Sequence, residues 1–108
     1  MSSLSTHVLD AVTGLPAAGM HVELCTSDGV KIASGTTDSD GRIGTFGDGD
    51  LAAGTYHLIF GTGNWFGDRQ IEHFYPEVSI AFAATDTSRH YHVPLLLSPY
   101  AYSTYRGS

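Results

Sequence analysis

Hydrophobic and polar residues alternate along most of the chain in short runs, which predicts a fold built almost entirely of β-strands. The runs recur about every ten residues between Gly, Asp, Ser and Thr, as in antiparallel sandwiches and barrels, whereas helical periodicity is hard to find. Seven or eight short strands within about 100 residues are typical of a two-sheet Greek-key sandwich. We expect the strands at residues 4–10, 21–27, 31–37, 42–46, 54–60, 77–84, 90–97 and 102–106.

Two segments between these runs carry a more specific signal. Asp28 and Gly29 join the second run to the third, and a two-residue Asp-Gly between alternating runs strongly indicates a β-hairpin. Residues 63–70 break the alternation and can form one or two helical turns, although their two glycines weaken a helix.

The composition fits a single compact domain over residues 1–108. The chain has 42% hydrophobic and 15% charged residues, which is too apolar for a disordered chain. A domain of this size can bury one modest core but no deep enclosed cleft as well. A site with walls on every side would therefore need a neighbouring subunit.

Charge and hydropathy exclude two kinds of partner. Five Lys and Arg stand against eleven Asp and Glu, so we expect no phosphate-tracking surface for nucleic acid. No apolar run approaches the roughly 20 residues of a membrane helix, and the first residues resemble no secretory leader, so we expect no membrane association. The lone Cys25 cannot form an internal disulfide, and a cytoplasmic location is the default.

Two of the six histidines occupy unusual positions. His7 and His92 each lie inside an apolar run, where a hydrophobic residue would be the ordinary choice. They could be core histidines bonded to backbone carbonyls, or groups that exchange a proton near neutral pH. His90 and His92 would share one sheet face, but no cysteine pair or nearby carboxylate completes a zinc site, so we predict no metal. The remaining three, His21, His57 and His73, we interpret as structural or exposed.

The scarce arginines and the aromatic tail add further candidates. Arg42 begins a strand and Arg106 lies near the end of the chain; each could hold a flat, oxygen-rich ligand or form an ordinary surface ion pair. Three tyrosines are unusual in a frayed terminus, so we expect the tail that contains Tyr100, Tyr102 and Tyr105 to dock on the rest of the domain. No nucleophilic serine elbow or paired-carboxylate motif appears, and this favours histidine-activated water over covalent catalysis.

Three segments together resemble the 5-hydroxyisourate hydrolases, the transthyretin-related enzymes of purine breakdown. They are residues 4–10 with Gly14-x-Pro16-Ala17, residues 40–42 (Asp-Gly-Arg), and residues 91–99 running on to the final Tyr-Arg-Gly-Ser. The resemblance implies a transthyretin-like sandwich of eight strands with one short helix at residues 62–70. It also implies a homotetramer, a dimer of dimers, with active sites in the channel between the dimers.

By the same resemblance, the chain hydrolyses 5-hydroxyisourate to 2-oxo-4-hydroxy-4-carboxy-5-ureidoimidazoline in urate degradation, without a cofactor. The catalytic residues would be His7, Arg42, His92 and Ser108, and the residues that bind this oxidised urate derivative would be His7, Arg42, Tyr105, Arg106, Gly107 and Ser108. Either histidine could be the general base. The alternative is a transthyretin-like carrier that binds a small aromatic ligand in the channel; it is the weaker hypothesis, because the carrier lacks the Tyr-Arg-Gly-Ser ending.

Overall fold

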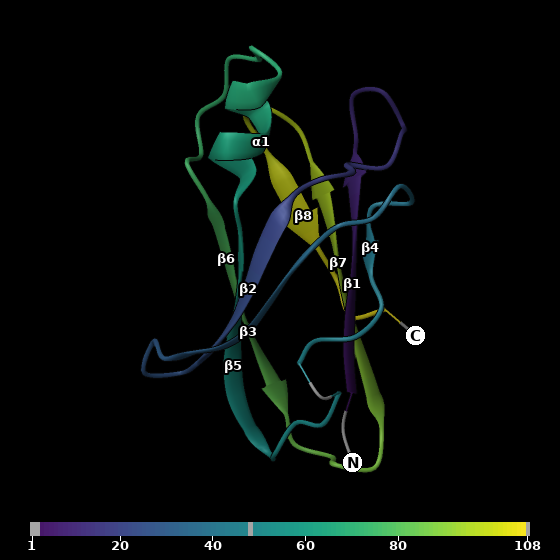
Figure 1. Ribbon diagram of the computed structural model, residues 1–108, viewed down its shortest axis with the longest axis vertical. Coiled ribbons are helices and arrows are strands. Elements are labelled where there is room, and N and C mark those ends of the chain that lie inside the picture. The colour runs from purple at the N-terminus through teal and green to yellow at the C-terminus, as the bar shows by residue number, and fades with distance from the viewer. Residues whose placement is uncertain (1–2, 48, 108) are drawn as a thin grey trace.

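Two four-stranded sheets pack face to face in the computed structural model, which describes residues 3–47 and 49–107 (Figure 1). One sheet has the strand order β4-β1-β7-β8 and the other has the order β3-β2-β5-β6. The elements are β1 (Ser3–Asp10), β2 (His21–Thr26), β3 (Lys31–Thr36), β4 (Arg42–Ile43), β5 (Gly54–Phe60), α1 (Thr62–Asp68), β6 (Val78–Ala84), β7 (His90–Leu97) and β8 (Tyr102–Thr104). The predicted all-β sandwich with one short helix is confirmed.

The first sheet brings the two ends of the chain together. Strand β1 pairs in parallel with β7 along its whole length and antiparallel with β4 on its other side. Strand β8 pairs antiparallel with the outer edge of β7. Residues from the start, the middle and the end of the sequence therefore lie side by side in one sheet (Figure 1).

Side-chain alternation separates a buried face from an open one, as the sequence pattern predicted. In β1, Leu4, Thr6 and Val8 are buried while the residues between them are half-buried. The second sheet covers this core with buried residues such as Leu58 and Phe60 from β5. Burying each such large apolar side chain contributes about 1.5–3 kcal/mol. The core therefore fixes which face of each strand points outward.

Some predicted elements differ in detail from the structure, and β8, for example, covers Tyr102–Thr104 rather than residues 102–106. Strands β2 and β3 form a hairpin, but its loop is longer than two residues, because Thr26 N–H donates to the carbonyl of Val30 and Gly29 adopts a φ of 89°. A register shift follows at Leu24 and Cys25, so the hairpin closes with a bulge. Strand β4 covers only Arg42 and Ile43 rather than residues 42–46.

The helix forms where the resemblance implied it. Indole Nε1 of Trp65 donates to the carbonyl of Ala18 at 2.8 Å, and the guanidinium of Arg69 lies 3.9 Å from the centre of the Trp65 ring. These tertiary contacts, and the burial of Phe66, hold a helix that its own glycines would leave marginal.

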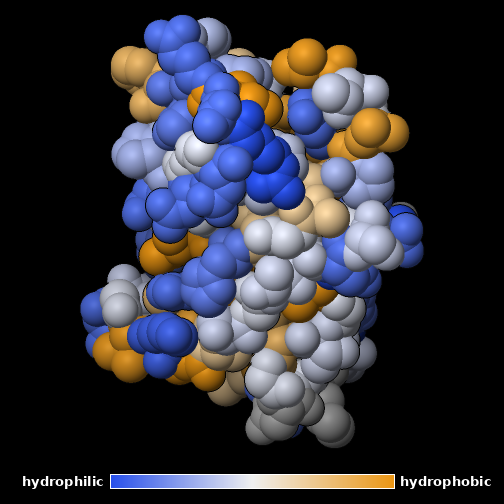
Figure 2. Space-filling view, turned by 45° about the horizontal axis from the view of Figure 1, so that its top comes forward, coloured by the Kyte–Doolittle hydropathy of each residue, from blue (hydrophilic) through white to orange (hydrophobic). Residues whose placement is uncertain are grey.

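In the described part of the chain, no helix has the length and apolar character needed to span a lipid bilayer. Figure 2 shows one side of the molecule, on which hydrophobic groups form small separate patches among hydrophilic ones.

Candidate active site

The open face of the β4-β1-β7 sheet collects the residues that the sequence singled out. His7 pairs directly with Arg42 on β4, and Ser5 pairs with His92 on β7. Because strands lie about 4.8 Å apart and side chains alternate, His7 is the diagonal neighbour of His92 on the same face. Both histidines are half-buried and Arg42 is exposed. Neither histidine belongs to the core, so that alternative is wrong.

A tight turn before β4 positions Arg42. The backbone N–H of Arg42 donates to Asp38 Oδ1 at 2.9 Å, and the Asp38 N–H donates to the carbonyl of Arg42 at 2.9 Å. Gly41 has a φ of 75°, and a side chain there would collide with the carbonyl of Val8 on β1. The hydrogen bond from Arg42 is the largest cause that lowers the pKa of the Asp38 carboxyl, so a negative charge faces this end of the site.

The surroundings of His92 favour its neutral form. Desolvation by burial lowers the pKa of its imidazole, and the nearby charges of Arg42, His7 and His90 act in the same direction. A backbone hydrogen bond of Ser5 opposes this shift. Neutral imidazole carries one ring nitrogen that can accept a proton, which is the state that a general base requires.

A continuous series of hydrogen bonds runs along the same face from His92 to the edge of the molecule. Ser5 Oγ lies 2.7 Å from His92 Nδ1 and 2.7 Å from His90 Nε2. Ser3 Oγ lies 2.5 Å from His90 Nδ1. His92 is thus held through one ring nitrogen, and His90 through both.

The C-terminal tail docks beside His92, as predicted. Strand β8 pairs with β7, and the Gly107 N–H then donates to the carbonyl of His92 at 2.9 Å. A Cβ on Gly107 would lie closer to the His92 ring than real Cβ atoms lie to their neighbours. The backbone makes these contacts, whereas the side chains of Tyr102 and Tyr105 are 42% and 59% exposed. Ser108 lies outside the described residues.

Arg106 lies in different surroundings from Arg42. Its guanidinium lies 5.9 Å from the centre of the Tyr91 ring, and Tyr91 is buried on the inner face of β7. Arg106 lines a pocket of about 370 Å³ between β6 and the β7–β8 pair, together with His92, Tyr105 and Arg89. The structure brings Arg106 close to the backbone of the site but does not pair it with His7 or Arg42.

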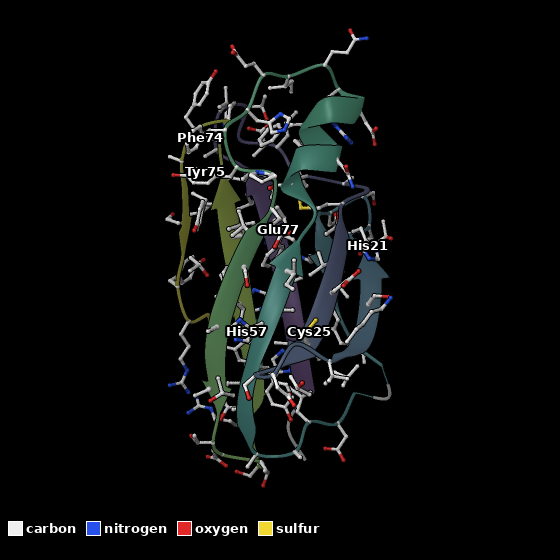
Figure 3. All side chains as sticks on the ribbon, turned by 90° about the vertical axis from the view of Figure 1, so that its left-hand side faces the viewer. His21, Cys25, His57, Phe74, Tyr75 and Glu77 are labelled. Carbon is white, nitrogen blue, oxygen red and sulfur yellow. The ribbon has the colours of Figure 1, made fainter. Side chains whose placement is uncertain are left out.

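The three histidines interpreted as structural lie elsewhere. His21 and His57 project from strands of the other sheet (Figure 3), and Nε2 of His21 lies 3.1 Å from Glu23 Oε2. His73 stacks on Phe66 at 5.5 Å beside the helix. Within residues 3–47 and 49–107, no three His, Cys, Asp or Glu side chains come together to hold a metal ion.

Sequence reasoning missed Ser5 and His90 as members of the site. Alternation predicted that His90 and His92 share one sheet face, but local pattern does not reveal that their strand lies beside the strand of Ser5 and His7. The parallel pairing of β1 with β7, which brings these residues together, is the information that the sequence pattern lacks.

The chain is thus an eight-stranded sandwich with histidines and an arginine on one open sheet face, as the resemblance implied. Residues 4–107 match the family model described as the HIUase/Transthyretin family, and the chain belongs to this family. It is 46% identical over 109 residues to a 5-hydroxyisourate hydrolase of Salmonella dublin. The alignment covers 97% of this chain and 80% of that protein.

Two solved structures of the family match this fold. The 5-hydroxyisourate hydrolase of Klebsiella pneumoniae aligns with a TM-score of 0.91 and 42% identity, covering 100% of this chain and 94% of that one. Sea bream transthyretin in complex with thyroxine aligns with a TM-score of 0.87 and 32% identity, covering 97% of this chain and 94% of that one. The family thus includes both an enzyme and a thyroxine-binding protein.

Proposed function

We propose that this chain is a 5-hydroxyisourate hydrolase that acts in urate degradation. The observation that carries the proposal is the direct pairing of His7 with Arg42, with His92 diagonal to them on one open face. The 42–46% identity to hydrolases of Klebsiella pneumoniae and Salmonella dublin favours the enzyme over the carrier, since sea bream transthyretin is 32% identical.

The chemistry follows from these groups. A neutral histidine, His7 or His92, takes a proton from water while the water oxygen bonds to a ring carbonyl carbon. The ring C–N bond of the tetrahedral intermediate then breaks, and the protonated histidine returns its proton to the leaving nitrogen. A positioned base contributes about 100-fold to 10,000-fold to the rate of such a step. The product is a ring-opened acid.

The arginines and the tail hold the substrate in this proposal. The planar guanidinium of Arg42 matches carbonyl oxygens and offsets negative charge that develops on the reacting oxygen. Gly107 lies against His92, and Tyr105, Arg106 and Ser108 close the site and orient water.

We propose that a second subunit covers the open face and that the assembly is a homotetramer. The groups of the site lie on the outer face of a sheet, and in the part of the chain that the structure describes no second sheet covers that face. Strands β6 and β8 each lie at the edge of a sheet, and an edge strand can pair its outer backbone groups with another copy. A cytoplasmic location agrees with the free, buried Cys25.

An absorbance assay tests the activity directly. Oxidation of urate generates 5-hydroxyisourate, and its decay is followed in the ultraviolet with and without the protein. The enzyme accelerates this decay, whereas a carrier leaves the rate unchanged.

Variants of the two histidines test the site. His7→Ala and His92→Ala should each remove the acceleration while the tetramer stays intact by gel filtration. His21→Ala is the matched control, because His21 is exposed on the other sheet. Full activity in both site variants would reject this assignment.

A further inference from the structure

The structure distinguishes the two candidate bases by what holds their rings. His92 Nδ1 lies 2.7 Å from the Ser5 hydroxyl, whereas among the described residues none hydrogen-bonds the ring of His7. A neutral imidazole carries its proton on one nitrogen and a lone pair on the other, and a bond to one nitrogen decides which is which. Only the tautomer of His92 is therefore under the control of a neighbouring side chain.

The Ser5 hydroxyl cannot serve both of its histidine partners as a donor. It has one proton and lies at hydrogen-bond distance from both His90 Nε2 and His92 Nδ1. If Ser5 donates to His92, the ring proton of His92 is on Nε2, and neither nitrogen can take a proton from water. If Ser5 donates to His90, it accepts from Nδ1–H of His92, and Nε2 of His92 keeps its lone pair.

The second arrangement also suits the charged state that follows proton transfer. Once Nε2 of His92 takes a proton, Nδ1–H still donates to Ser5, and no other group has to exchange a proton. In this arrangement His90 accepts from Ser5 through Nε2 and donates from Nδ1–H to Ser3 Oγ. The charge of Arg42, close enough to His92 to lower its pKa, favours a lone pair over a proton on the unheld nitrogen.

We propose that Ser5 and His90 are positioning residues that fix His92 as the Nδ1–H tautomer, which leaves Nε2 as the proton acceptor. This inference rests on the proposed hydrolase function and names His92, rather than His7, as the general base. Ser5 and His90 do not touch the substrate; they act through the imidazole of His92.

Nitrogen NMR of the histidine rings provides a test that needs no substrate. In the 15N-labelled protein, the shifts of His92, assigned by comparison with His92→Gln, should report a protonated Nδ1 and an unprotonated Nε2. Ser5→Ala removes the hydroxyl that accepts the Nδ1 proton, although the backbone hydrogen bond of Ser5 remains, and it should move the ring toward a mixture of tautomers. His90→Phe keeps a planar ring without nitrogens and should change the shifts in the same direction. Ser34→Ala, at an exposed serine on β3, is the matched control and should change nothing.

Kinetics give the second readout. Ser5→Ala should lower kcat by about tenfold to 100-fold, the usual range for a partner that orients a reacting group, with little change in KM. Ser5→Thr keeps the hydroxyl and should restore most of kcat. The acidic limb of the pH profile should also shift in Ser5→Ala. The charged and titratable groups that act on His92 in that variant are Arg42, His7 and His90.

An unchanged His92 tautomer or an unchanged kcat in Ser5→Ala would overturn the inference. If the wild-type protein fails to accelerate 5-hydroxyisourate decay, the proposed function is rejected instead, and the NMR comparison still decides whether Ser5 sets the tautomer.

Discussion

Substitution of Gly107 by alanine should inactivate the site while leaving the fold intact. A Cβ on Gly107 would collide with Cδ2 of His92 and would lie 3.1 Å from Cγ and 3.2 Å from Cβ of the same residue. Ordinary contact begins at 3.4 Å, so the tail and the imidazole must move apart by about 1 Å. A displacement of about 1 Å at a reacting group typically costs about 100-fold in rate. That loss corresponds to about 2.7 kcal/mol of transition-state stabilisation.

The measurement is kcat/KM for 5-hydroxyisourate decay in the Gly107→Ala protein, beside its thermal unfolding. Gly44→Ala is the matched control, because a Cβ at this exposed glycine after β4 meets nothing within 4 Å. We expect a loss of about 100-fold for Gly107→Ala and an ordinary rate for Gly44→Ala, with similar Tm values. Wild-type kcat/KM in Gly107→Ala would refute the reasoning that the tail and His92 form one site.

Three further predictions concern the charge, the tail and the helix. Since burial and Arg42 lower the pKa of His92, the midpoint of its NMR titration should lie below the ordinary value of 6.5. Arg42→Gln removes a positive charge and should raise this midpoint. An unchanged midpoint in Arg42→Gln would contradict the electrostatic account. Deletion of residues 105–108 leaves β8 complete and should abolish the acceleration of substrate decay. The circular dichroism spectrum should remain that of a β-sandwich. Unchanged turnover would show that the tail does not belong to the site. In denaturant unfolding, Gly67→Ala should stabilise the protein by about 0.5–1 kcal/mol. Gly63→Ala should destabilise it, because its Cβ would lie 2.5 Å from the carbonyl oxygen of Pro76. A Gly63→Ala protein more stable than Gly67→Ala would show that α1 does not pack as described.

Local pattern was sufficient for most of the fold. Alternation in residues 54–60 located β5 to the residue, because a half-buried sheet leaves a period of two in the sequence, and the apolar run at residues 90–97 located β7. Strand β4 was predicted too long, since its pairing with β1 ends after Ile43 and no local signal marks that point.

The site depended on information that local pattern lacks. His7 and His92 stood out because polar rings in apolar runs are unusual, and Arg42 because cations are scarce. Ser5 and His90 were ordinary residues until the parallel register of β1 and β7 placed the Ser5 hydroxyl between two rings. The tail was predicted to dock by its tyrosines, but the backbone of Gly107 makes the contact with His92, and glycine gives no such signal.

The parallel pairing of β1 with β7 makes the site a late product of folding. Ser5 and His92 are 87 residues apart in sequence, and the remaining tail residues must follow before Gly107 can bond to His92. Contacts of such long range close slowly, because the entropy of ordering the intervening chain is lost before they form. During synthesis on the ribosome, β1 has no parallel partner until β7 has been released. Recovery of activity after dilution from denaturant should therefore report the last folding step, behind the signal of the β2–β3 hairpin, whose strands lie close together in the sequence.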